Sequence, residues 1–350
     1  MKKYYTRACN FYYGSNSIEN ISKKISLPLN GNKLISFDCI ELITRNSKKI
    51  INIKNIKKLP KNVKKKVFLD LNNIIKKKKF NKLKFGKTPI LMGVLNATPD
   101  SFSDGGKFLN NRSANKQIKK LLDSGVQIID LGGESTRPGA EVIPPQEEWK
   151  RIKGKLNNLN NKKCLISLDT RKSFVLKKSL PYKLGLINDV SGLSYDKEII
   201  KILKKYKIPF VIHHMQGSPK TMQNNPYYKN VLLDIYDYFE EKIKLIRKKN
   251  IKHNNIILDP GIGFGKNLKH NITLMSNISI FHSLGFPIML GVSKKRYIKD
   301  LSGINDSKER IGGTVSSSIY SSLQGVQILR VHDVNEVNQA FKVFEKLQFN

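Results

Sequence analysis

The chain has 350 residues, a formal net charge of +37 at pH 7 and 39% hydrophobic residues, which is enough for one large domain and an appendage. It holds no apolar stretch of roughly 18 residues and no apolar segment behind its first lysines, so neither a transmembrane helix nor a secretory signal is expected. Cys9, Cys39 and Cys164 show no CxxC spacing, which argues against a disulfide framework or a zinc site and favours a cytoplasmic protein.

The positive charge raises the question of nucleic-acid binding. It consists of 54 Lys and only ten Arg, and it accompanies many Asn and Ile residues, as a drift of codon usage towards A and T would produce. Arg is the side chain best suited to bidentate hydrogen bonds with bases and phosphates, and it is scarce here. We therefore attribute the charge to composition and expect no nucleic-acid partner.

Residues 1–86 form a lysine-rich N-terminal extension, with 22 Lys and Arg against four Asp and Glu. Short strands are expected at 33–37 and 39–43, near an Asn-Gly turn at 30–31. The run at 57–84 predicts either a basic amphipathic helix or a tether. The extension carries no chemical motif, so its role stays open, and residues 87–350 are expected to form the catalytic domain.

From residue 87 onwards, short apolar runs alternate with helix-length segments. Continuous apolar strands between helices indicate a parallel sheet that is buried on both faces. Eight such units in about 260 residues predict an α/β fold, a closed (β/α)₈ TIM barrel. The expected strands are 90–96, 127–133, 164–170, 186–192, 209–215, 256–262, 287–292 and 328–334.

A doubly wound open sheet is the alternative fold. It would place a Gly-rich GxGxxG turn after the first strand. The residues at that position are Asn96-Ala97-Thr98-Pro99-Asp100, which do not form such a turn. The barrel is therefore the preferred fold.

Polar residues end every one of the eight runs. In a (β/α)₈ barrel the carboxyl ends of the strands form the active site, and a buried charge there is costly unless it is paired or liganded. A ring of such residues therefore predicts a site for an anionic small molecule. Its members are Asn96, Glu134, Asp169, Asn188, His214, Asp259, Lys295, Arg330 and His332.

Two long loops follow the first two strands, and their Gly and Pro content suits lids that close over a substrate. They lie within LNATPDSFSDGG at 95–106 and DLGGESTRPG at 130–139. These segments resemble the two signatures of the dihydropteroate synthase family. Further matches follow in order at SLDT (167–170), IND (187–189), HMQG (214–217), LDPGIGFGK (258–266), SKK (293–295) and RVHDV (330–334).

The resemblance covers roughly residues 88–348 and implies a transferase of folate biosynthesis. Members of that family condense 6-hydroxymethyl-7,8-dihydropterin diphosphate with 4-aminobenzoate, releasing diphosphate and forming 7,8-dihydropteroate. The diphosphate is expected to leave first, so that the aryl amine attacks a pterin-stabilised methylene cation. A homodimer is also implied.

The resemblance assigns the strand-end residues to subsites. Asp169, Asn188, Asp259 and Lys295 would bind the pterin, which offers N–H donors and acceptors along one edge. Arg330 and His332 would bind the diphosphate, and Asn96 would be the protein ligand of Mg²⁺. Asp169, Lys295, Arg330 and His332 are the expected catalytic residues. Thr136 would contact the pterin diphosphate or line the aminobenzoate pocket, and the remaining candidates for that pocket are Phe102, Arg137, Phe264 and Arg296.

Two positions depart from the family pattern. Arg296 stands where many members have Ser, so it either pairs with the aminobenzoate carboxylate or faces solvent. His213 replaces a common apolar residue beside His214. Because neighbouring residues on a strand point to opposite faces, a metal-binding pair is not expected, and His213 is interpreted as a packed or solvated side chain.

Two other functions remain as alternatives. A pterin-binding methyltransferase module would keep the fold and bind methyltetrahydrofolate, but the first loop and the pairing of Arg330 with His332 favour the synthase. A protein that binds nucleic acid or a membrane surface through residues 1–86 is the third hypothesis.

Overall fold

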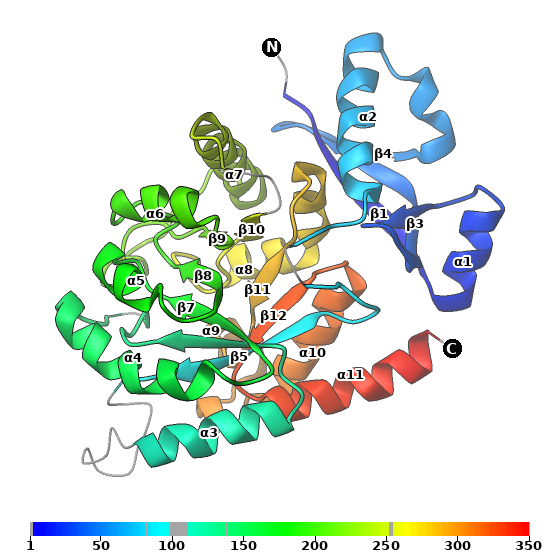
Figure 1. The fold of residues 1–350 in the computed structure, drawn as a ribbon. Coiled ribbons are helices and arrows are strands. Elements are labelled where there is room, and N and C mark those ends of the chain that lie inside the picture. Colours follow the sequence, from blue (N-terminus) through cyan, green and yellow to red (C-terminus); the bar gives the residue numbers. More distant parts are fainter. Residues whose placement is uncertain (1–2, 81–82, 99–110, 138, 252–254, 350) are drawn as a thin grey trace.

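The computed structural model describes residues 3–80, 83–98, 111–137, 139–251 and 255–349. Residues from Ile90 onwards build an eight-stranded parallel sheet with helices between the strands, as predicted (Figure 1). The strands are β5 (Ile90–Asn96), β6 (Ile128–Gly132), β7 (Leu165–Asp169), β8 (Leu184–Asp189), β9 (Phe210–His213), β10 (Ile256–Asp259), β11 (Met289–Gly291) and β12 (Ile328–Val331).

The sheet closes into a barrel. Its order is β10-β9-β8-β7-β6-β5-β12-β11, and a parallel bridge between Leu258 and Ile288 joins the two ends. The Leu258 amide donates to the Pro287 carbonyl at 2.9 Å across this seam. Closure confirms the (β/α)₈ barrel, and the open-sheet alternative is wrong.

Several strands end earlier than predicted. The run at 186–192 was expected to stay extended, but β8 ends at Asp189. The Gly192 amide donates back to the Asp189 carbonyl, and Gly192 has a φ of +59°, which a strand cannot contain. The residues beyond the strand ends therefore belong to the loops around the barrel mouth.

The helices cover the outside of the barrel. In α7 the apolar residues Val231, Ile235, Phe239 and Ile246 are buried, and the side chain of Asn230 caps the first turn. The elements are α3 (Asn111–Asp123), α4 (Pro145–Leu159), α5 (Ser173–Ser179), α6 (Glu198–Tyr206), α7 (Val231–Lys248), α8 (Leu268–Ser276), η4 (Ile278–Leu284), α9 (Arg296–Ser302), η5 (Ser307–Glu309), α10 (Ile311–Leu323) and α11 (Val334–Gln348).

The N-terminal extension is a folded unit with an antiparallel sheet of its own. The two strands predicted at 33–37 and 39–43 form one continuous strand, β3, whose register with β1 is the same on both sides of residue 38. Within the lysine-rich run at 57–84, residues 61–75 form the predicted helix, and the described residues after it are not helical. The elements are β1 (Tyr5–Tyr13), α1 (Gly14–Ser22), β2 (Leu27–Leu29), β3 (Asn32–Ile43), β4 (Lys48–Asn52), η1 (Ile53–Lys58) and α2 (Lys61–Ile75).

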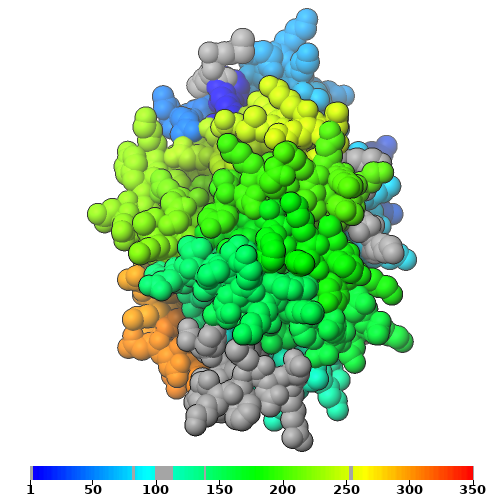
Figure 2. All heavy atoms as spheres, turned by 60° about the vertical axis from the view of Figure 1, so that its left-hand side comes forward, coloured from blue at the N-terminus to red at the C-terminus, as the bar shows by residue number. Residues whose placement is uncertain are grey.

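A second hydrophobic core holds this extension together. Phe37 and Ile40 of β3 pack with Val67 and Ile74 of α2, and Phe349 from the end of α11 joins them. The extension lies against one side of the barrel (Figure 1). In Figure 2, which shows the face covered by the helices of residues 145–250, it is visible only at the margins.

The segment after α2 closes the amino-terminal end of the barrel. Phe80 is 1% exposed and packs in one cluster with the first residues of the strands, among them Met92, Ile128 and Met289. Phe80, near the end of the extension, is therefore part of the barrel core.

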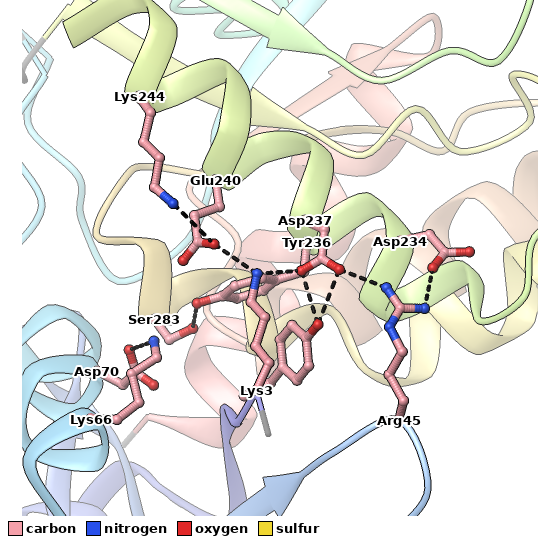
Figure 3. A network of polar contacts seen from close by, with 11 residues as sticks. Lys3, Arg45, Lys66, Asp70, Asp234, Tyr236, Asp237, Glu240, Lys244 and Ser283 are labelled. Atoms are coloured by element: carbon pink, nitrogen blue, oxygen red, sulfur yellow. Dashed lines mark hydrogen bonds and ion pairs between the residues drawn. The ribbon is translucent and has the colours of Figure 1, made fainter. Parts of the chain in front are cut away.

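A charged contact ties the extension to α7 (Figure 3). Lys3 donates to Asp237 at 2.6 Å and to Glu240 at 2.7 Å. Arg45 forks onto Asp234 and Asp237, both at 2.6 Å. Since these acids recur along one face of α7, the extension holds that helix at three positions.

Among the helices of the described residues, none combines the length and apolar character needed to cross a membrane.

Phe80 fills the amino-terminal end of the barrel as a plug. This predicts that the stability of the extension and the stability of the barrel are coupled. Phe80→Ala should lower the free energy of unfolding by about 3–5 kcal/mol, because it opens a cavity at the closed end of the barrel. Phe68→Ala is the matched control, since Phe68 is 43% exposed on α2, and its effect should stay within about 0.5 kcal/mol. Chemical denaturation measures both. Equal effects of the two substitutions would contradict the plug.

Candidate active site

A pocket opens at the carboxyl ends of the barrel strands and brings together five of the predicted pterin and diphosphate residues, namely Asp169, Asn188, Asp259, Lys295 and Arg330. Thr136 and Phe264, predicted for the lids, also line it. The remaining lining residues are Val190, His213, Gly261, Ile262 and Gly291.

A larger hollow lies at the seam between the extension and the barrel. It is lined by Lys33, Lys77, Lys78 and Lys87 among other residues, and it shares no residue with the strand-end pocket. None of the predicted site residues reaches it, so the chemistry belongs to the strand-end pocket.

Three charged side chains from β6, β7 and β12 meet on the floor of the pocket. Arg330 Nε donates to Asp130 Oδ2 at 2.6 Å, and Arg330 Nη2 donates to Asp169 Oδ2 at 2.9 Å. Asp130 is fully buried and Asp169 is 8% exposed. An unpaired carboxylate at this depth would be strongly destabilising, so Arg330 is what allows two of them here.

Asn188 belongs to the same network, since its Nδ2 donates to Asp130 Oδ2 at 3.0 Å. Asp130 therefore orients both Asn188 and Arg330. Burial and the neighbouring Asp130 raise the pKa of Asp169 well above its usual value, against the opposing effect of Arg330. A carboxyl group with a raised pKa can keep its proton and then donate a hydrogen bond as well as accept one.

Asp259 ends β10 on the next wall. Its Oδ1 accepts from the Gly261 amide at 2.8 Å, and the side chain is 4% exposed. Burial raises the pKa of Asp259 to about 6, while the Gly261 hydrogen bond and the cations Lys295, Lys266 and Arg330 oppose the rise.

Lys295 stands at the entry to α9, with its Nζ 4.2 Å from the centre of the Phe264 ring. Burial, followed by the nearby Arg330, lowers the pKa of Lys295 to about 8, while Asp259 opposes the change. The ammonium group is held between an aromatic face and a carboxylate, where it can donate to a carbonyl or ring nitrogen of a ligand.

His332 directly follows β12 and is not among the residues that line the pocket; its Nδ1 is 3.1 Å from Ser293 Oγ. Desolvation, followed by the cations Arg330, Lys294, Lys295 and Arg137, lowers the pKa of His332. Because the side chain is exposed, the four cations are the main cause of this shift. A neutral imidazole here can donate a hydrogen bond without adding charge.

Arg330 and His332 were both expected to bind the diphosphate. The Arg330 guanidinium donates to Asp130 and Asp169, and His332 is exposed just beyond β12 and is not among the residues that line the pocket. Among the described residues, none accepts from Arg330 Nη1, which leaves this group for a ligand.

The lid candidates have different environments. Arg137 is exposed at the second loop and lies near enough to His332 to influence its pKa. Arg296 is exposed, outside the pocket lining, with its Nε 3.7 Å from Asp300. Phe102 lies outside the described residues.

The second loop is anchored by a buried charge network. Glu134 accepts from Arg171 Nε at 2.9 Å and from Lys172 Nζ at 2.7 Å, and Lys172 also pairs with Glu148 at 2.8 Å. Glu134 therefore fixes the loop that carries Thr136 and Arg137, and it does not line the pocket.

The two histidines on β9 differ from the expected ring. His214 was named as the polar end of this strand, but it points away from the pocket towards Lys266 Nζ, 3.1 Å from its Nδ1. His213 lines the pocket instead. The strand ends at His213, so this residue, not its neighbour, has the inward position.

Asn96 ends β5, directly opposite Gly132 of β6, and is partly buried. Within the part of the chain that the structure describes, no three His, Cys, Asp or Glu side chains converge as a complete metal site would require. An amide oxygen is nevertheless a ligand that Mg²⁺ accepts, together with substrate oxygens and water. Asn96 fits that role.

Two residues of the site escaped the sequence analysis. Asp130 interrupts an apolar strand, and a charge in such a run was the signal that could have identified it. Lys266 is 3% exposed and donates to the carbonyls of Gly261 and Phe264 at 2.9 and 2.8 Å. It shapes the loop after β10 that holds Asp259.

Comparisons with known proteins agree with this site. Residues 92–332 match the family described as pterin binding enzyme. The dihydropteroate synthase of Neisseria meningitidis serogroup B is 40% identical over 267 residues, which is 75% of this chain and 94% of the relative. That of Escherichia coli K12 is 38% identical over 73% of this chain and 91% of its own.

Solved structures are similar as well. The Yersinia pestis dihydropteroate synthase in complex with a sulfonamide drug has 37% identity and a TM-score of 0.72, covering 77% of this chain and 98% of its own. The Xanthomonas albilineans enzyme in complex with 7,8-dihydropteroate has 30% identity and a TM-score of 0.67, covering 74% and 94%. The chain therefore belongs to the dihydropteroate synthase family of pterin-binding enzymes.

Proposed function

We propose that the chain condenses (7,8-dihydropterin-6-yl)methyl diphosphate with 4-aminobenzoate to give 7,8-dihydropteroate and diphosphate, as a transferase of folate biosynthesis. The observation that carries this proposal is the convergence of Asp169, Asn188, Asp259, Lys295 and Arg330 on one pocket. The named ligand of the similar Xanthomonas albilineans structure, 7,8-dihydropteroate, is the product of this reaction.

The pterin edge would be recognised by complementary hydrogen bonds. Asp259 accepts from the amino group and the adjacent ring N–H, while Asn188, held by Asp130, offers both a donor and an acceptor. Lys295 donates to the ring carbonyl or a ring nitrogen, and Asp169 contacts the ring system beside Arg330. All four side chains are held by the protein before ligand arrives, which lowers the cost of binding.

In the reaction the C–O bond to the diphosphate breaks and the bonding pair leaves with the oxygen. Arg330 Nη1 and the neutral imidazole of His332 stabilise the departing charge by hydrogen bonds. The ring delocalises the methylene cation that remains. The amine of 4-aminobenzoate then forms the C–N bond and loses a proton to solvent, so no strong general base is needed.

Asn96 would hold Mg²⁺ through its amide oxygen, with diphosphate oxygens and water completing the shell. When bound, the ion neutralises part of the diphosphate charge.

The aminobenzoate would lie beside the loop after β6. We assign Thr136 and Phe264, which line the pocket, and Arg137, which lies near His332, to this subsite. Phe102 remains a candidate from its motif. For Arg296 the exposure of the side chain favours the solvent-facing position, and pairing with the aminobenzoate carboxylate is the alternative.

We further propose a division at residues 86 and 87, with 1–86 acting as a brace for α7 and the barrel floor, and a homodimeric assembly. Cys9 and Cys39 face each other across β1 and β3 as free thiols, which supports a cytoplasmic location. The next experiment distinguishes the proposed synthase from a methyltransferase module and from a nucleic-acid role for residues 1–86.

Diphosphate release should depend on 4-aminobenzoate and fall by about 10²–10³-fold in Asp259→Ala, because the pterin edge loses its main acceptor. A coupled assay for diphosphate measures it, and Asp123→Ala, an exposed carboxylate at the end of α3, is the matched control. Undiminished turnover in Asp259→Ala, or tight binding of methyltetrahydrofolate without turnover, would overturn the assignment. If the full chain binds RNA and the chain without residues 1–86 does not, the nucleic-acid role is supported instead.

Affinity for the pterin diphosphate should fall as the pH rises through about 8, because burial lowers the pKa of Lys295 to about 8 and the ammonium form is the donor. The ammonium is present below that pH and is lost above it. Lys295→Arg keeps its charge at high pH, so its weaker binding should stay constant up to pH 9.5. Calorimetric titration at a series of pH values measures both, and a flat profile for the unsubstituted protein would contradict this role.

A further inference from the structure

Among the polar side chains that line the pocket in the described part of the chain, His213 alone has no task in the proposed function. It is 4% exposed and lies in the wall between β8 and β10. In the β9–β10 register His213 is the direct partner of Asp259. Residues in register on neighbouring strands project to the same face, so the imidazole flanks the carboxylate that would bind the pterin edge.

The contacts of the ring fix its tautomer. Nδ1 is 3.0 Å from the Val190 carbonyl oxygen, which can only accept a hydrogen bond, so Nδ1 carries the proton. Burial, followed by the cations Lys266 and Lys295, lowers the pKa of His213 well below its ordinary value. A second proton is therefore excluded at neutral pH, and Nε2 presents a lone pair.

The position of the ring is also fixed. The Tyr238 hydroxyl donates to the His213 carbonyl at 3.0 Å, and the Phe264 ring meets the imidazole edge-on with centres 4.7 Å apart. Gly261 leaves room for the Nε2 edge, because a Cβ at that position would lie 3.1 Å from Nε2 and 2.0 Å from the His214 carbonyl oxygen.

Nε2 has no hydrogen-bond partner among the described residues, and it is not among the side-chain atoms sealed from solvent. A histidine kept only for packing would satisfy both nitrogens within the protein or leave its polar edge in a closed core. Here one nitrogen is committed and the other is left open on the pocket side.

We propose that His213 is a specificity-determining residue whose Nε2 accepts a hydrogen bond from an N–H of the pterin aminopyrimidinone edge, next to Asp259. This inference rests on the proposed function. A fixed acceptor favours rings that present N–H at this position and disfavours rings that present a carbonyl oxygen there, because two lone pairs would then face each other.

Two substitutions test it by calorimetry with the pterin diphosphate. His213→Met removes the acceptor and fills the space, and should weaken binding by roughly 3- to 10-fold, the value of one neutral hydrogen bond. His213→Gln carries an oxygen at similar reach and should recover part of that loss. In turnover assays the loss should fall on KM more than on kcat, because the contact is made equally in the ground state and the transition state.

Nitrogen NMR of the unsubstituted protein gives a second test, which does not depend on a binding constant. The His213 resonances, identified by their absence from His213→Met, should report a protonated Nδ1 in the free protein. The Nε2 resonance should move upfield when the pterin diphosphate binds, as it does when a bare imidazole nitrogen accepts a hydrogen bond.

The two proposals fail in different ways. Absence of diphosphate release by the unsubstituted protein would sink the proposed function itself. If the protein is active but His213→Met binds as tightly and Nε2 does not shift with ligand, the function stands and the role of His213 is wrong.

Discussion

The pairing of Arg330 with Asp130 and Asp169 is the interaction on which the site depends. Two carboxylates lie on adjacent buried strands, Asp169 at the end of β7 and Asp130 inside β6, where neither could remain ionised alone. The arginine that pairs with them comes from the last strand, so the charge balance is complete only when β12 has taken its place beside β5. The charge balance of the site therefore depends on the pairing of the last barrel strand with the first. Asn188 is then oriented through Asp130, and Arg330 keeps one nitrogen for a ligand.

The sequence predicted the barrel because each strand is an apolar run between helix-length segments. This pattern can be recognised without knowing how the strands pair. It also identified most of the pocket, since a polar residue at the end of a buried strand has few structural explanations. It did not distinguish His213 from His214, because which one faces inward depends on the residue at which β9 ends. It passed over Asp130, whose partner lies 200 residues away in Arg330. Pairings at that separation are set by the closed barrel.

The extension was the least predictable part, because lysine-rich segments give weak periodicity. The structure makes it part of the barrel by three contacts of different kinds: Phe80 in the floor, the acidic face of α7 held by Lys3 and Arg45 (Figure 3), and Phe349 in the second core. The same helix α7 carries Tyr238, which holds the carbonyl of His213. A path of direct contacts thus leads from the extension to the pocket wall, and most of the chain's lysine charge takes no part in it.

The most direct test of this account is the activity and stability of Asp130→Asn. The substitution keeps the shape and an acceptor for Asn188 but removes one of the two charges that hold Arg330. The account predicts a protein that still folds, with a free energy of unfolding lower by about 3 kcal/mol and a kcat/KM for diphosphate release lower by about 10²-fold. Asp130→Asn with unchanged stability and unchanged kcat/KM would contradict it.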